Sequence, residues 1–211
     1  MSDTKLTGVY AILPADLATD QLLATATAVL KGGISIVQFR DKKSGYNRAL
    51  KRAKALRSLT TEYGACLMVN DSVQMALDAG ADGVHLGRED MVNLTQLRLE
   101  IGTKLMVGVT CRMDAALAKH VLNDGADYIS FGAVWASTTK PEVPAIGLPR
   151  LIKAREMFPE GNICAIGGIH SGNIAQVKMA GADCAALMSG LFSAADIEAE
   201  AAKLVAIWQA A

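Results

Sequence analysis

The chain has 211 residues, of which 51% are hydrophobic and only 5% aromatic, so Ala, Val, Ile, Leu and Met must fill one sizeable core. Its 21 Lys and Arg residues balance 21 Asp and Glu residues, which excludes the strong basic field that gathers nucleic acid or anionic membranes. We therefore expect a single domain over residues 1–211, with no nucleic-acid or membrane partner.

Cysteine usage and the first residues bear on the compartment. The four cysteines, at positions 66, 111, 164 and 184, form no CxxC pair, and three of them stand in apolar, strand-like runs, which is typical of reduced core residues. The opening MSDTKLTGVY lacks a charged-then-apolar signal pattern, and no apolar run approaches the roughly 18 residues needed to cross a bilayer. We expect a soluble, cytoplasmic protein.

Short apolar runs alternate with segments of helical period along the whole chain. Eight strand–helix units in 211 residues, with strands that are apolar throughout, favour a single α/β domain of the (β/α)8 barrel type, also called a TIM barrel. An open, doubly wound sheet is the main alternative. Strands are predicted at 9–13, 35–39, 66–69, 83–86, 105–110, 128–131, 163–166 and 184–188, and helices at 20–30, 46–63, 73–78, 94–101, 115–123, 148–157, 172–180 and 194–208.

The tripeptide Gly-Ala-Asp occurs three times between a predicted helix and the next strand, ending at Asp82, Asp127 and Asp183. These aspartates enter strands at the amino end, opposite the loops that carry chemistry in barrels of this type. We interpret them as structural.

Polar residues gather at the opposite ends of the strands. Gln38, Arg40 and Lys42 alternate along an extended chain, which puts an amide and two cations on one side. Asp71 and Asp90 follow neighbouring strands at the same edge, where ligands bind in parallel sheets. We predict a metal site there, although either carboxylate could instead cap the helix that follows it.

Later loops carry groups suited to phosphate. The longest gap between a strand and its helix contains Lys140, and long loops in compact domains are often lids. The last two strands run into Gly167-Gly168 and Ser189-Gly190, where bare amides can approach an anion. His85, on a strand, is more simply interpreted as a packed core residue, although a ligand contact is the open alternative.

Six short motifs carry a family resemblance, and they occur in the order of that family from the second predicted strand to the seventh. Together they make the chain similar, over nearly its whole length, to the thiamine phosphate synthase family. The motifs are Gln38-Phe39-Arg40-Asp41-Lys42, Asn70-Asp71, HLGREDM at 85–91, Gly108-Val109-Thr110, Ser137-Thr138-Thr139-Lys140 and Ile166-Gly167-Gly168-Ile169.

The resemblance implies a (β/α)8 barrel and a transferase of thiamine biosynthesis. Its reaction joins 4-amino-5-hydroxymethyl-2-methylpyrimidine diphosphate to thiazole phosphate with the help of Mg2+, through a pyrimidine cation, and releases pyrophosphate. It also implies substrate-binding roles for Gln38 (the pyrimidine), Arg40, Lys42, Asn70 and Lys140 (the diphosphate), Thr110 (the usual serine position), and Ser137, Thr139, Gly168, Met188 and Ser189 (the thiazole phosphate). Of these, Arg40, Lys42 and Lys140 would be catalytic, and Asp71 and Asp90 would bind Mg2+.

The chain also departs from the family pattern. Cys111-Arg112 replaces the more usual Ala-His pair, and the first strand ends in an unusual Leu13-Pro14-Ala15-Asp16. A thiazole tautomerase of the same fold is the nearest rival, but it uses a histidine in the region that Arg112 occupies. A barrel that binds thiazole phosphate or thiamine phosphate without catalysis is the other alternative.

Overall fold

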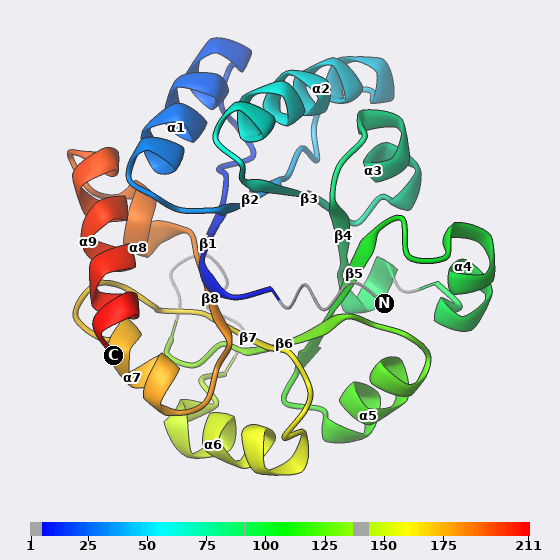
Figure 1. Ribbon diagram of the computed structural model, residues 1–211, viewed down its shortest axis with the longest axis vertical. Helices are drawn as coiled ribbons and strands as arrows, with labels where there is room; N and C mark the ends of the chain where they lie inside the picture. The colour runs from blue at the N-terminus through cyan, green and yellow to red at the C-terminus, as the bar shows by residue number, and fades with distance from the viewer. Residues whose placement is uncertain (1–5, 91, 137–143) are drawn as a thin grey trace.

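The structure is a computed structural model, and it describes residues 6–90, 92–136 and 144–211. Eight parallel strands form a closed barrel in chain order, and β8 pairs with β1 so that Tyr10 lies beside Ala186. Figure 1 shows the helices as a ring around this barrel. The strands are β1 Gly8–Ile12, β2 Ile36–Phe39, β3 Cys66–Asn70, β4 Gly83–Leu86, β5 Met106–Arg112, β6 Tyr128–Gly132, β7 Ile163–Ile166 and β8 Cys184–Leu187.

The helices follow the strands as the sequence predicts, apart from two local differences. A short 3-10 turn lies between β4 and α4, and the helical segment after β8 is divided into α8 and α9. The helices are α1 Thr19–Lys31, α2 Tyr46–Glu62, α3 Val73–Ala79, η1 Arg88–Asp90, α4 Leu94–Ile101, α5 Ala115–Asn123, α6 Gly147–Met157, α7 Ile174–Met179, α8 Ser189–Phe192 and α9 Ile197–Ala210. The barrel prediction is confirmed, and the open doubly wound sheet is wrong because β1 and β8 are paired.

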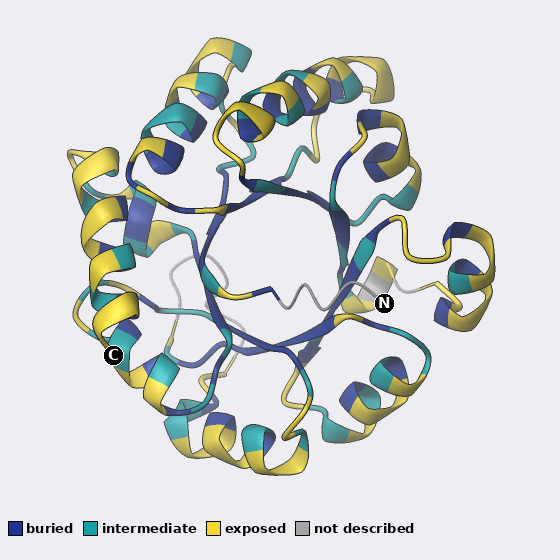
Figure 2. Cartoon of the chain, viewed as in Figure 1, coloured by how far each residue is buried: buried dark blue, intermediate teal, exposed yellow. Residues whose placement is uncertain are grey.

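Apolar side chains fill two layers. The larger one lies between the strands and the inner faces of the helices, which Figure 2 shows as buried where they face the barrel and exposed outside. The smaller one lies inside the barrel and includes Tyr10, Met68 and Tyr128. Gly108 makes room for the Tyr128 ring, because a Cβ at this position would lie 1.9 Å from its Cζ.

Three salt-bridged aspartates close the amino end of the barrel. Each aspartate of a Gly-Ala-Asp tripeptide accepts a hydrogen bond from the first or second residue of the strand before its own, and it also pairs with an arginine from a helix. This places the three aspartates in the structural role predicted for them. The groups are Asp82 with Leu67 N–H and Arg57, Asp127 with Val107 N–H and Arg98, and Asp183 with Ile163 N–H and Arg155.

The first two strands lack such a group among the described residues, and their junction is built differently. Gly32, which ends α1, lies directly against α9, since a Cβ at this position would be 2.4 Å from Ala201 Cβ and 2.7 Å from the Glu198 carbonyl oxygen. None of the helices in the described ranges is long and apolar enough to span a membrane.

Candidate active site

Two cavities lie side by side at the carboxyl end of the barrel. The first, of about 200 Å3, is bordered mainly by polar residues from β2 to β5, and we call it the polar cavity. The second, of about 160 Å3, is bordered by glycines and apolar residues from β6 to β8, and we call it the glycine cavity. They share four lining residues, Thr110, Arg112, Ile166 and Met188, so a ligand in one cavity would border a ligand in the other.

The loop after β2 supplies two cations to the polar cavity. Gln38, Arg40 and Lys42 all line it, as their alternation predicts. Asp41 stabilises the loop, since it accepts hydrogen bonds from the N–H groups of Lys43 (3.1 Å) and Ser44 (2.9 Å). Burial raises the pKa of Asp41, but these hydrogen bonds and the nearby Arg52 guanidinium outweigh it, so the pKa lies below its ordinary value.

The carboxylates of Asp71 and Asp90 converge over the end of β4. A Cβ placed on Gly87 would lie 2.7 Å from Asp90 Oδ2 and 3.4 Å from Asp71 Oδ1. Asp71 also lies 3.1 Å from Lys42 Nζ, and its backbone is left-handed, with a φ of 65°. Asp tolerates this conformation better than most residues. The prediction that the two carboxylates meet at one edge is therefore confirmed.

Neither aspartate caps the helix that follows it. Ser72 caps α3 by accepting from Met75 N–H at 3.2 Å, and Asn93 caps α4 by accepting from Gln96 N–H at 2.9 Å. Both carboxylates thus stand at the cavity without the structural role that capping would give them.

The donor set suits Mg2+. This ion prefers oxygen ligands, and in phosphate sites it uses one or two carboxylates together with phosphate oxygens and water. Asp71 and Asp90 both line the polar cavity and provide such a pair of carboxylates. Within the described ranges, no three or more His, Cys, Asp or Glu side chains cluster in a way that could hold a metal by themselves. A cation bound by these two carboxylates would complete its coordination with oxygens from water or substrate.

A chain of buried hydrogen bonds crosses the barrel beneath the polar cavity. Gln38 Nε2 donates to Tyr10 Oη (2.6 Å), which lies 3.5 Å from Tyr128 Oη. His85 then bridges Tyr128 Oη (2.7 Å from Nδ1) and Thr110 Oγ1 (2.8 Å from Nε2).

Burial controls the ionisation of this chain. It lowers the pKa of His85 to about 4, although the nearby Asp71 carboxylate acts in the opposite direction, so the imidazole is neutral at neutral pH. Burial also raises the pKa of Tyr10 and Tyr128 well above normal, so both phenols keep their protons. All five members of the chain are therefore uncharged.

The sequence motifs do not indicate a role for Tyr10 or Tyr128, and the position of His85 in a strand favours packing. Tyr10 and Tyr128 lie 118 residues apart in apolar strands, and they belong to none of the six motifs. The available signal is the presence of a tyrosine in each of two apolar strands, because a polar-tipped aromatic there needs a hydrogen-bond partner. His85 lines the polar cavity as well as joining the chain.

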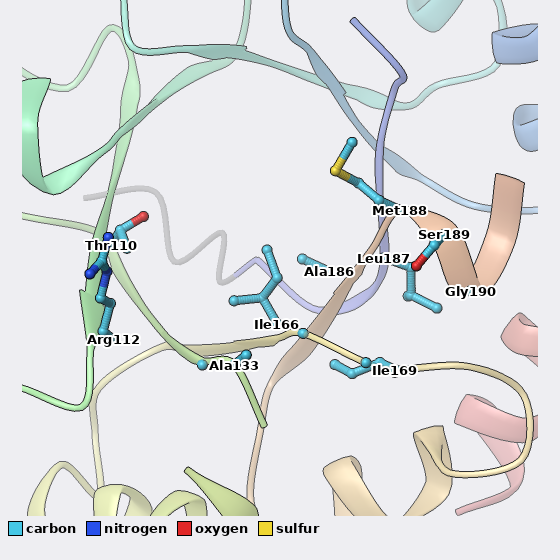
Figure 3. Close-up of a pocket in the computed structure, with 13 residues that line it drawn as sticks. Thr110, Arg112, Ala133, Ile166, Ile169, Ala186, Leu187, Met188, Ser189 and Gly190 are labelled. Atoms are coloured by element: carbon cyan, nitrogen blue, oxygen red, sulfur yellow. The ribbon is translucent and has the colours of Figure 1, made fainter. Parts of the chain in front are cut away.

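The glycine cavity has a backbone wall. Gly167 and Gly168 follow β7, while Met188 and Ser189 follow β8, and all four line the cavity as predicted. Figure 3 shows Thr110 and Arg112 on the β5 side and Met188 and Ser189 across from them. Asn173 Nδ2 donates to the Gly168 carbonyl at 2.9 Å, which fixes the loop that follows β7.

The remaining predicted site residues, Ser137, Thr139 and Lys140, lie outside the described residues. Asn70 lines the polar cavity, and its amide donates to Asp71. Every predicted site residue that the structure describes thus lines at least one of the two cavities.

Comparison with known proteins identifies the family. A family described as thiamine monophosphate synthase matches residues 9–191 of this chain. The chain belongs to this family. The thiamine-phosphate synthase of Thioalkalivibrio sulfidiphilus is 45% identical over 209 residues, with 97% of each chain covered. That of Halorhodospira halophila is 43% identical, covering 98% of this chain and 96% of the other.

A solved structure agrees in fold. Thiamine phosphate pyrophosphorylase from Pyrococcus furiosus superposes with a TM-score of 0.85 at 30% identity, covering 97% of this chain and 96% of that one. As a member of the thiamine monophosphate synthase family, the chain is a transferase of thiamine biosynthesis. The resemblance given by the six motifs is therefore confirmed.

Proposed function

We propose that this enzyme joins 4-amino-5-hydroxymethyl-2-methylpyrimidine diphosphate to thiazole phosphate, giving thiamine phosphate and pyrophosphate. The observation that carries the proposal is the pair of adjoining cavities. One is lined by cations and carboxylates and the other by glycine backbone, and they share the wall formed by Thr110 and Met188. Two anionic substrates held in this way would meet at that wall.

The polar cavity suits the diphosphate. Arg40 and Lys42 line it together with Asn70, and we assign the diphosphate oxygens to these three residues, with Lys140 as a further cation. Negative charge grows on the diphosphate as the carbon–oxygen bond breaks. Fixed cations then stabilise the transition state more than the ground state, which is how electrostatic catalysis raises kcat.

We assign a metal-binding role to the two aspartates on the same electrostatic grounds. Asp71 and Asp90 would hold Mg2+ with the help of diphosphate oxygens, and the ion would add positive charge beside the leaving group. Asp71 lies within 3.1 Å of Lys42 Nζ, so the carboxylate also keeps that lysine at the cavity.

The bond changes need no protein nucleophile. The electron pair of the carbon–oxygen bond leaves with the diphosphate, and the resulting pyrimidine cation is captured by the lone pair of the thiazole nitrogen, which forms the new carbon–nitrogen bond. Gln38 would hold the pyrimidine, since it lines the polar cavity. Gly168, Met188 and Ser189 would hold the thiazole phosphate through backbone and hydroxyl donors, together with Ser137 and Thr139.

We also propose that the enzyme works in the cytoplasm. All four cysteines are free, and burial raises the pKa of Cys66 and Cys111 to about 12, as expected for unreactive structural thiols. The substrates are small molecules, and the proposal requires no macromolecular partner.

One assay tests the function. Purified protein is incubated with both phosphorylated substrates and Mg2+, and the products are separated by chromatography. We expect thiamine phosphate and pyrophosphate in equal amounts, with turnover that disappears on chelation of Mg2+. Isomerisation of the thiazole without coupling would indicate a tautomerase, and tight binding of thiazole phosphate or thiamine phosphate without turnover would indicate a non-catalytic barrel.

A further inference from the structure

The hydrogen-bond chain beneath the polar cavity has a direction, which follows from proton counting. Gln38 directs its amide N–H to Tyr10, so the Tyr10 oxygen is an acceptor in that contact. The proton of Tyr10 therefore needs another acceptor, and Tyr128 Oη, at 3.5 Å, is the one that the described residues offer. Buried hydroxyl protons rarely lack an acceptor, because an unpaired donor loses its hydrogen bond to water without a replacement.

His85 continues the same direction of hydrogen-bond donation. Tyr128 accepts from Tyr10, so its own proton goes to His85 Nδ1, 2.7 Å away. A neutral imidazole with Nδ1 as acceptor carries its proton on Nε2. That N–H lies 2.8 Å from Thr110 Oγ1, which accepts it. The threonine hydroxyl proton is then free to point into the cavities that Thr110 lines.

Both ends of the hydrogen-bond chain line the cavities. Gln38 uses one N–H of its Nε2 on Tyr10, which leaves the amide oxygen for the polar cavity. In the described part of the chain, no hydrogen bond occupies that oxygen. If the hydrogen bonds ran in the reverse direction, the donor and acceptor roles at both ends would be exchanged. Gln38 would then offer N–H groups to the cavity, and Thr110 would offer only lone pairs. The chain thus links the hydrogen-bonding character of β2 to that of β5.

We propose that Tyr10, Tyr128 and His85 are positioning residues that fix Gln38 as an acceptor and Thr110 as a donor toward the aminopyrimidine ring. This inference rests on the proposed function. A 4-aminopyrimidine donates through its amino group and accepts through its ring nitrogens, so it complements an acceptor on one side and a donor on the other. The ring would be held in one orientation, with its reactive methylene toward the wall shared with the glycine cavity.

The tautomer of His85 gives a direct test without substrate. The protein contains three histidines, so labelling with 15N-histidine gives few signals. The variants His120→Gln and His170→Gln assign the signals of the other two histidines. Two-bond 1H–15N correlation at neutral pH should show His85 protonated on Nε2. In Tyr128→Phe, the Nδ1 signal should move toward that of a nitrogen without a hydrogen-bond donor. An Nδ1–H tautomer, or an averaged mixture, would overturn the assigned direction.

Kinetics tests the positioning role. Tyr128→Phe should lower kcat/KM for the pyrimidine diphosphate by up to about tenfold, the usual limit for one neutral hydrogen bond. The KM for thiazole phosphate should stay unchanged. Tyr46→Phe is the matched control, since it removes a tyrosine hydroxyl that donates to Asp78 at 2.6 Å on the outside of the barrel. Equal losses for both substrates with a lower Tm would show that Tyr128 acts only in stability.

Threonine variants test the donor itself. Thr110→Ser keeps the hydroxyl and should retain activity, whereas Thr110→Val should lose more activity than Tyr128→Phe, because it removes the ligand contact directly. Equal activity of the serine and valine variants would overturn the donor role. If the wild-type protein makes no thiamine phosphate, the proposed function fails, while the histidine tautomer still decides the direction of the chain.

Discussion

Replacing Asp71 by Asn tests the predicted metal site with little disturbance of the fold. Asn is the closest replacement in size, and like Asp it tolerates the φ of 65° that this position adopts. Ala would add backbone strain and confuse the result. The substitution removes one negative charge from the pair that converges over Gly87 and leaves the backbone hydrogen bond from Asp71 N–H to the His85 carbonyl.

The structure sets the expected sizes of the two effects. The ion pair with Lys42 joins a carboxylate to an ammonium whose side chain is 54% exposed, and such pairs contribute about 0–1 kcal/mol to folding. Tm should therefore fall by no more than about 2–4 °C. Loss of a group that stabilises transition-state charge typically costs about 10²–10³ in rate. A large fall in kcat/KM with a nearly unchanged Tm is the expected combination.

The assay is steady-state formation of thiamine phosphate across a Mg2+ titration, with a thermal melt of each variant. Asp78→Asn is a matched control, because Asp78 lies on α3 and accepts hydrogen bonds from Tyr46 (2.6 Å) and Gln74 (2.7 Å) away from the cavities. Excess Mg2+ should restore part of the activity of Asp71→Asn and have no effect on the control. Wild-type turnover in Asp71→Asn, at the same Mg2+ requirement, would refute the metal assignment.

Four further outcomes are expected. Lys42→Ala should lower kcat by about 10²–10³ with a smaller change in KM for the diphosphate, and a change in KM alone would indicate ground-state binding. Its control is Lys43→Ala, which removes an exposed cation paired with another loop and should leave turnover unchanged. Asp183→Asn should lower the free energy of unfolding by about 2–3 kcal/mol in urea titrations without changing kcat/KM, and a selective loss of activity would contradict its structural role. Gly168→Val should destabilise the protein and weaken the binding of both substrates together, because Gly168 has a φ of 65° and a Cβ there would lie 2.7 Å from its nearest neighbour. A stable variant that loses only the binding of thiazole phosphate would instead support a purely steric role at the phosphate. Since the unfolded chain protonates His85 near pH 6.5 and the folded chain only near pH 4, stability should fall by at most about 3 kcal/mol as the pH drops through this range, and His85→Gln should flatten that part of the curve.

The sequence predicted the barrel because strand period, helix period and the repeated Gly-Ala-Asp all agreed. It predicted the polar cavity for a related reason, since residues such as Arg40 and Asp90 follow strands and must emerge at one end of a parallel barrel. It left the capping alternative open, because Ser72 and Asn93 are as suitable for caps as the neighbouring aspartates, and the choice between them depends on the folded backbone.

What the sequence could not show depends on contacts across the barrel. Tyr10 on β1 and Tyr128 on β6 meet only after the four strands from β2 to β5 have been placed between them around the closing sheet. Thr110 belongs to one of the six motifs, but whether its hydroxyl donates or accepts depends on His85. The protonation of His85 depends in turn on burial by residues distant in the sequence. Such properties belong to the assembled interior and have no local pattern.

The contact of Gly32 with α9 has a consequence for the order in which a growing chain can fold. The three salt-bridged groups at Asp82, Asp127 and Asp183 each join neighbouring strands, so each can form as soon as its own segment has left the ribosome. The junction beside β1 differs, because β8, its second pairing partner, and α9, which covers Gly32, are both made last. During most of synthesis β1 therefore has one unpaired edge, and we expect closure of the barrel to be among the final events, when a nascent chain is most open to wrong pairing.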